Sequence, residues 1–256
     1  MTSIYLFVLL MGLGTIAILA SCGALIRFYA AQQGNDPSLN IGTPLYAHVF
    51  LQLFAKLLVA TAIGVIVNQW TDINLAPVLT MIIENSIYWP DLWSHLRPSM
   101  VIGLHAGFIM SLFFIFVYPI LIPERVVSIL TQLRQCQGVV PRLLFEGILT
   151  EVVIRWGVLS FVYGLFDVFF GKVWWVQFVA VFFSAIFYAA SRLPNLYSLY
   201  RSVTGADLFV VWLVGSGVGC VFGWIFVDHG ILAVMLAHIC YEVATILVDK
   251  YRPKWD

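Results

Sequence analysis

The chain has 256 residues, of which 62% are hydrophobic and only 10% are charged, and its formal net charge is +0. A soluble domain carries roughly 25% charged residues, so this composition excludes a soluble enzyme, and the balanced charge offers no surface for nucleic acid. We therefore expect an integral membrane protein whose partners include membrane lipid and exclude nucleic acid. We expect an all-α fold, because helices satisfy their own backbone hydrogen bonds in lipid.

Seven apolar runs are long enough to cross a bilayer as helices. They cover residues 4–25, 45–67, 100–122, 142–169, 174–193, 208–227 and 231–249. Residues 75–88 are also apolar, but Pro77, Glu84 and Asn85 interrupt them, which favours a short interfacial helix over an eighth crossing. Residues 125–137 are expected to form an amphipathic connector on the membrane surface.

The pattern predicts a polytopic membrane helix bundle of about seven transmembrane helices in two parts. Residues 1–137 would form an N-terminal three-helix segment with interfacial connectors. Residues 138–256 would form a four-helix core with a basic C-terminal tail.

Basic residues predict the orientation of the bundle, because cytoplasmic loops are enriched in Lys and Arg. The loops on one side of the seven predicted helices carry nine of the 13 Lys and Arg residues: Arg27, Arg125, Arg134, Arg142, Arg192, Arg201, Lys250, Arg252 and Lys254. The opposite loops carry only Arg97 and Lys172. This split predicts that the N-terminus lies outside and the C-terminus lies in the cytoplasm.

Ionisable side chains inside two of the helices are candidate functional residues, because charges at mid-membrane depth are costly. Glu151 and Arg155 are spaced i, i+4 and form either an internal strut or part of a site. Glu146, one turn earlier, is expected near the helix end, where Arg142 is its candidate partner.

His238 and Glu242 also share one helical face. The imidazole could activate water or donate to an oxyanion, with Glu242 orienting it. The two side chains could instead bind a metal, or simply satisfy each other. No third ligand and no H-E-x-x-H pattern is present, and the four cysteines show no paired spacing, so we expect no metal and no cofactor.

Two further features of the later helices have structural interpretations. Ser191 ends the helix before Pro194, and a serine at a helix end more often bonds to the backbone than acts as a nucleophile. Gly215, Gly219 and Gly223 recur every four residues, which predicts close packing of this helix against its neighbours, including the one that carries His238.

The last four helices together resemble the CPBP family of intramembrane proteases. This family comprises the type II CAAX prenyl endopeptidases and the bacteriocin-processing and immunity proteins. Its motifs are Glu-Glu-x-x-x-Arg, then Phe-x-x-x-His, a Gly-rich helix and His-x-x-x-Asn. Residues 150–155 (TEVVIR), 187–191 (FYAAS), 223–230 and 238–242 (HICYE) repeat that order and spacing within residues 138–248.

The chain departs from the family at three motif positions. By this resemblance, Thr150 stands where the family has its water-activating glutamate, and Ser191 stands where it has the assisting histidine. Glu242 stands in place of the asparagine of the oxyanion site. The family residues that remain are Glu151, Arg155 and His238. Loss of the base and its partner should lower activity by orders of magnitude, since each positioned acid–base group contributes roughly 10²–10⁴-fold.

Three hypotheses follow. The protein is a degenerate, weakly active or inactive member that acts as a membrane scaffold and binds a membrane protein or a lipid-modified peptide. Alternatively, it is an active intramembrane endopeptidase with a rearranged Glu/His site, in which Glu151, or Glu242 with His238, supplies the base. A small transporter or membrane-complex subunit is the third. The missing base favours the scaffold.

The resemblance also predicts the layout of the site. Glu151, Arg155, His238 and Glu242 should face one interior cavity that opens to the cytoplasmic side. Thr150, Phe187 and Ser191 should line that cavity.

Overall fold

The computed structural model describes residues 2–32, 43–71, 75–84, 89–199 and 203–251. The side chain of Arg27 and the residues Asn85, Arg201, Arg252 and Lys254 lie outside the described part of the chain. Every element within these ranges is helical, as the sequence predicts.

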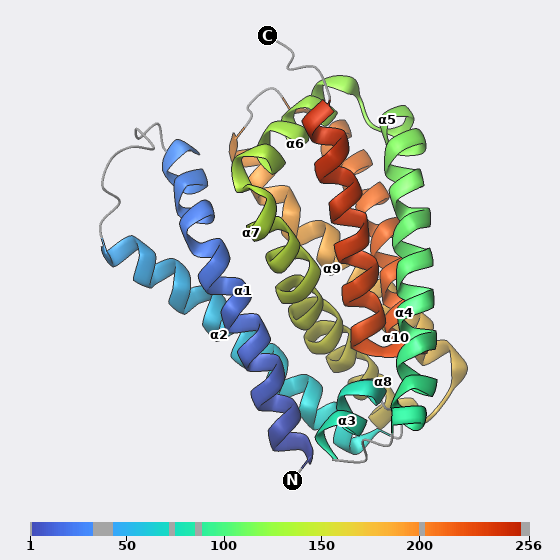
Figure 1. Cartoon of the computed structure of the whole chain (residues 1–256). Helices are drawn as coiled ribbons and strands as arrows, with labels where there is room; N and C mark the ends of the chain where they lie inside the picture. Colours follow the sequence, from blue (N-terminus) through green and yellow to red (C-terminus); the bar gives the residue numbers. More distant parts are fainter. Residues whose placement is uncertain (1, 33–42, 72–74, 85–88, 200–202, 252–256) are drawn as a thin grey trace.

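The first two helices form an antiparallel pair on one side of the molecule (Figure 1). Helix α1 spans Thr2–Gln32 and α2 spans Thr43–Trp70. Both exceed the predicted 4–25 and 45–67 by a few residues, and both are apolar enough to cross a membrane. Helix α3, Pro77–Ile83, is a short helix of two turns inside the segment 75–88, so the expectation of a short helix there is confirmed for its described part.

The third crossing begins earlier than the sequence predicts. Helix α4 spans Trp89–Leu112 and continues through a π-helical segment, Phe113–Val117, into α5, Tyr118–Leu121. The predicted start after Pro98 is wrong, because α4 runs through that proline. A proline removes one backbone donor, and a membrane helix tolerates this loss where neighbouring groups replace the bond.

Helix α6, Glu124–Gln137, is the predicted connector and lies across one end of the bundle (Figure 1). Its apolar residues Val126, Val127 and Ile129 are buried. The next crossing consists of α7, Val139–Leu144, two π-helical segments, Phe145–Thr150 and Val152–Leu159, and α8, Ser160–Phe170. Helix α9, Trp174–Leu199, follows and continues past the predicted stop at Pro194.

Helix α10, Gly205–Tyr251, contains the last two predicted crossings joined without a loop. Gly230 has φ 80° and ψ 179°, and there the chain folds back so that the two halves run side by side (Figure 1). The N–H of Ile231 donates to the carbonyl of Leu75 at 3.0 Å, which ties the reversal to the start of α3. The 47 residues would measure about 70 Å if straight, more than twice a bilayer core of roughly 30 Å.

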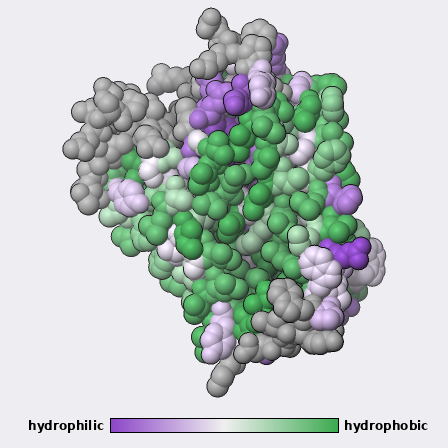
Figure 2. Space-filling model, viewed as in Figure 1, coloured by the Kyte–Doolittle hydropathy of each residue, from purple (hydrophilic) through white to green (hydrophobic). Residues whose placement is uncertain are grey.

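The described chain has six helices long and apolar enough to cross a membrane, and the reversal in α10 makes seven crossings. The two termini accordingly lie at opposite ends of the molecule (Figure 1). Figure 2 shows hydrophobic side chains over most of the visible face, with hydrophilic ones concentrated near the ends. This surface is suited to lipid contact.

Close packing around α10 differs from the expectation. A Cβ on Gly219 or Gly223 would lie within 3 Å of Ala185 or Val181, so this stripe packs the first half of α10 against α9. The half that carries His238 is approached instead by α4, where a Cβ on Gly107 would lie 2.5 Å from the carbonyl oxygen of Ala237. Small residues on α4, outside the resemblance, therefore position the histidine.

Candidate functional site

A buried carboxylate and imidazole meet at the centre of the bundle. Nδ1 of His238 lies 2.5 Å from Oε1 of Glu151 and bridges the second half of α10 to the π-helical crossing. The two residues are 87 positions apart in the chain, and both side chains have 0% exposure. With the carboxylate ionised, Nδ1–H donates and Nε2 becomes the acceptor nitrogen of the ring.

Arg155 completes an interior cluster, defined as Glu151, Arg155 and His238. Its Nε lies 3.3 Å from Oε2 of Glu151, and its side chain is also 0% exposed. The guanidinium donates from Nη1 to Oγ of Ser184 at 3.3 Å and lies 5.4 Å from the ring centre of Tyr188. The predicted i, i+4 pair of Glu151 and Arg155 is therefore present, with its positive charge offsetting the carboxylate.

Aromatic rings hold the imidazole of His238 in place. The ring of Phe222 stacks on it at 4.8 Å between centroids with an interplanar angle of 13°. Tyr188 and Tyr241 contact its other sides, with centroid distances of 6.5 and 5.9 Å. The imidazole is therefore fixed by packing as well as by Glu151.

The interior cluster retains unused hydrogen-bonding capacity. Oε2 of Glu151, Nε and Nη2 of Arg155 and Nε2 of His238 are buried and have no hydrogen-bond partner among the described residues, although Oε2 and Nε face each other as an ion pair at 3.3 Å. Buried polar atoms are normally satisfied, and each exception marks a place where a ligand or a reacting group could bind. Nη2 of Arg155 and Nε2 of His238 have neither a hydrogen bond nor an ion pair in the described structure, so they define one candidate site.

Glu242 belongs to a different group of charges, nearer the C-terminal end of α10. We call this group the end cluster and define it as Arg134, Arg142, Glu242, Thr245 and Asp249. Arg142 donates to Oε2 of Glu242 at 3.2 and 2.9 Å, to Oγ1 of Thr245 at 2.7 Å and to Asp249 at 3.1 Å.

The predicted role of Glu242 in orienting His238 is therefore wrong. One helical turn separates the two residues, and the carboxylate extends toward Arg142 on α7, whose guanidinium forms charge-assisted hydrogen bonds with it. Glu151 orients the imidazole instead.

Arg134 extends the end cluster to α6. It donates to both carboxylate oxygens of Asp249 at 2.8 and 2.9 Å. Burial lowers the pKa of Arg134, but the hydrogen bonds and charge of Asp249 outweigh burial and raise this pKa above its usual range. The end cluster therefore joins α6, α7 and α10 through ion pairs.

A third ion pair joins the π-helical crossing to α9. Glu146 accepts from Arg192, not from Arg142 as the sequence predicts, and also accepts from Oγ1 of Thr150 at 3.2 Å. Arg192 in turn lies over the ring of Tyr188, with its guanidinium carbon 4.6 Å from the ring centre. Tyr188 therefore lies between this pair and Arg155 of the interior cluster.

The predicted cavity-lining residues do not surround the interior cluster. Thr150 is half-buried and bonded to Glu146, whereas Phe187 is 51% exposed on the outer surface of α9. Ser191 is exposed and donates to the carbonyl oxygen of Tyr188 at 2.7 Å, the backbone bond expected of a helix-end serine.

The predicted opening of the interior cluster to the cytoplasmic side is also wrong in this structure. Glu151, Arg155 and His238 are all 0% exposed, because Phe222 and Tyr188 pack against them. The Glu146–Arg192 pair and the end cluster lie between them and the end of the bundle that carries α6. Within the described ranges, no group of three or more His, Cys, Asp or Glu residues could hold a metal.

Sequence reasoning missed several residues that shape the interior cluster. Ser184, Tyr188 and Arg192 follow one another at i, i+4 on α9, which places them on one face of that helix. This spacing was a usable signal for the face of α9 that meets Arg155. Nothing in the sequence pattern singles out Phe222 as the ring stacked on His238.

Comparison with known proteins agrees with the motifs. Residues 133–244 match the model of the family described as Rce1-like, type II CAAX prenyl endopeptidase Rce1-like. No curated protein and no solved structure matched the chain. The matched segment contains α7 to α9, nearly all of α10 and every residue of the interior cluster.

The predicted resemblance is thereby confirmed over residues 133–244, and the chain is an integral membrane protein that is similar in this segment to the Rce1-like type II CAAX prenyl endopeptidases.

Proposed function

We propose that the protein is a non-catalytic CPBP-type scaffold that binds a membrane-embedded partner, a lipid-modified peptide or a membrane protein, without hydrolysing it. One observation carries the proposal. The only acid in the interior cluster, Glu151, is neutralised by Arg155 at 3.3 Å, hydrogen-bonded by His238 at 2.5 Å and fully buried. Oε1 is engaged by the imidazole, Oε2 faces the guanidinium, and the buried group has no exposed surface through which to reach water.

The motif positions that would supply a base support the same proposal. Thr150 and Ser191 occupy these positions, and a hydroxyl group does not accept a proton from water at neutral pH. The hydroxyl of Thr150 donates to Glu146, and that of Ser191 donates to the backbone of its own helix. Neither hydroxyl contacts the interior cluster through a described bond.

The orientation predicted from the basic loops is part of the proposal. Arg125, Arg134, Arg142, Arg192 and Lys250 belong to segments at the end of the bundle that carries α6, whereas Arg97 and Lys172 belong to segments at the opposite end (Figure 1). We propose that the end with α6 and the C-terminus is cytoplasmic. A fluorescent reporter that folds only in the cytoplasm should fluoresce when fused to the C-terminus and stay dark when fused to the N-terminus.

Peptide hydrolysis by the purified protein in detergent tests the scaffold proposal. We expect no turnover of prenylated C-terminal peptides by the wild type. We also expect those peptides to bind, in fluorescence anisotropy, more tightly than the same peptides without the lipid. The double variant Thr150→Glu/Ser191→His should gain turnover, because it restores the family residues at both positions.

Matched variants make the assay decisive. Wild-type turnover that disappears in Glu151→Gln but persists in Glu84→Gln, a carboxylate on the exposed end of α3, would overturn the proposal. Absence of both turnover and binding in a wild type that is folded by its melting transition would exclude the peptide as ligand and leave a membrane protein as the partner to be sought.

A rearranged peptidase is the second candidate, and one observation favours it. His238 keeps Nε2 without a partner among the described residues while Nδ1 is held by Glu151. This is the arrangement in which a carboxylate orients an imidazole that acts as general base. In that case both Glu151→Gln and His238→Ala should abolish wild-type turnover, and Glu242→Gln should not, since Glu242 is bonded to Arg142.

A further inference from the structure

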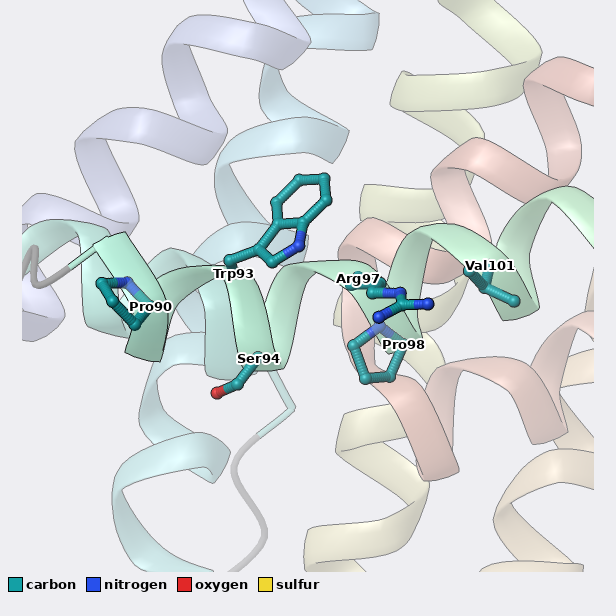
Figure 3. A pocket seen from close by; sticks show the side chains of 6 residues that line it. All are labelled: Pro90, Trp93, Ser94, Arg97, Pro98 and Val101. Carbon is teal, nitrogen blue, oxygen red and sulfur yellow. The ribbon is translucent and has the colours of Figure 1, made fainter.

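The first turns of α4 form a depression at the opposite end of the bundle from α6. It has a volume of about 630 Å³ and is lined by Pro90, Trp93, Ser94, Arg97, Pro98 and Val101. Figure 3 shows that all six side chains come from this one helix, with Trp93 and Arg97 adjacent along it. No part of the interior cluster contributes, so the depression is separate from the proposed function.

Arg97 is the one charged residue among the six that line this depression. Its side chain is exposed and makes no hydrogen bond or ion pair within the part of the chain that the structure describes. Other arginines near the ends of the bundle are paired, as Arg125 is with Asp207 and Arg192 with Glu146. The guanidinium is therefore available to a ligand, and its planar fork fits a phosphate through two parallel hydrogen bonds.

The position of Arg97 along the bundle places it at the depth of lipid headgroups. From Arg97 to the end of the crossing at Leu121 the helix rises about 36 Å, slightly more than a hydrocarbon core of roughly 30 Å. Three exposed tryptophans mark the same level: Trp70 at the end of α2, Trp93 itself and Trp174 at the start of α9. Tryptophans concentrate at the membrane–water interface.

We propose that this depression binds an anionic phospholipid headgroup in the leaflet that surrounds this end of the protein. Arg97 holds the phosphate, the indole of Trp93 lies at the interfacial level, and Pro98 and Val101 meet the start of the acyl chains. Lys172 is the only other described Lys or Arg on this side. The positive charge in the depression is therefore that of Arg97 alone, and a single lipid per protein is expected.

Native mass spectrometry in detergent tests the site, with phosphatidylglycerol and phosphatidylcholine titrated separately as probes. We expect wild type to retain one phosphatidylglycerol and Arg97→Gln to bind it about fivefold more weakly. Arg97→Lys should fall between them, because it keeps the charge but loses the bidentate geometry. Lys172→Gln is the matched control and should retain wild-type binding.

The other outcomes overturn the proposal. Equal losses in Arg97→Gln and Lys172→Gln would mean diffuse attraction to the surface, and no loss in Arg97→Gln would mean that the depression binds no phosphate. Displacement of the lipid by soluble glycerol phosphate at similar concentrations would mean that the site recognises a free phosphate. Should Arg97→Gln fail to fold, Trp93→Ala, which keeps the guanidinium, must also weaken phosphatidylglycerol binding if the site is as proposed.

Discussion

The interior cluster and the end cluster both hold buried ionisable side chains, but their hydrogen bonding differs. Both clusters join the π-helical crossing or its start to the second half of α10. In the end cluster every buried polar side-chain atom has a hydrogen-bond partner, whereas the interior cluster leaves four such atoms without one. The end cluster is therefore complete as structure, and the interior cluster alone has capacity left for a ligand.

The largest effect is expected from removing the central arginine of the end cluster. Arg142→Met leaves Glu242 without its arginine and takes one of two arginines from Asp249, so we expect a loss of about 3–5 kcal/mol in unfolding free energy. Denaturant unfolding in mixed micelles measures it. The control Arg125→Gln breaks a pair whose arginine is 51% exposed and should change the unfolding midpoint far less. Equal effects of the two variants would mean that the end cluster is not a structural lock.

A smaller effect is expected where α4 packs against the half of α10 that carries both clusters. Gly107→Ala places a methyl group 2.5 Å from the carbonyl oxygen of Ala237, so we expect a loss of about 1–3 kcal/mol. Gly12→Ala on α1 meets nothing within 4 Å and serves as the control. Because both clusters use this half of α10, hydrogen exchange should rise around His238 and Asp249 together. A faster hydrogen exchange around His238 alone would show that the end cluster does not depend on this packing contact.

The smallest expected quantity is the coupling between Glu151 and Arg155. A double-mutant cycle of Glu151→Gln and Arg155→Met should give a coupling of about 0.5–3 kcal/mol, because each single variant leaves the other group buried without its charge partner. Thermal unfolding of the four proteins in one detergent measures it. Additive losses would mean that the 3.3 Å contact carries no stabilisation.

The sequence predicted the number and order of the crossings because both follow from local properties. Apolar runs of about 20 residues identify helices without knowledge of their neighbours, and the i, i+4 spacing of Glu151 and Arg155 placed them together. The helix boundaries predicted at Pro98 and Pro194 were wrong because they, too, were inferred from local sequence alone. Whether a proline ends a helix depends on surrounding groups that the local sequence does not reveal.

The partners of the buried charges could not be predicted in the same way. Glu151 meets a histidine 87 residues away, and Glu242 meets an arginine 100 residues away. Each choice depends on how far helices slide along one another. The π-helical turns of residues 145–150 and 152–159 also change which side chains share a face, and a 3.6-residue period does not anticipate them.

The loop-free reversal at Gly230 has a consequence for how the chain enters the membrane during synthesis. The second half of α10 carries His238, Glu242 and Asp249, a load that makes independent insertion of this helix unfavourable. The first half of α10 is largely apolar, and it is joined to the second half at Gly230 without a loop that could remain in water while one half inserts. The two halves must therefore insert into the membrane together, as one helical hairpin. The apolar first half then carries the polar second half into the bilayer, where its charges meet those of α6 and α7.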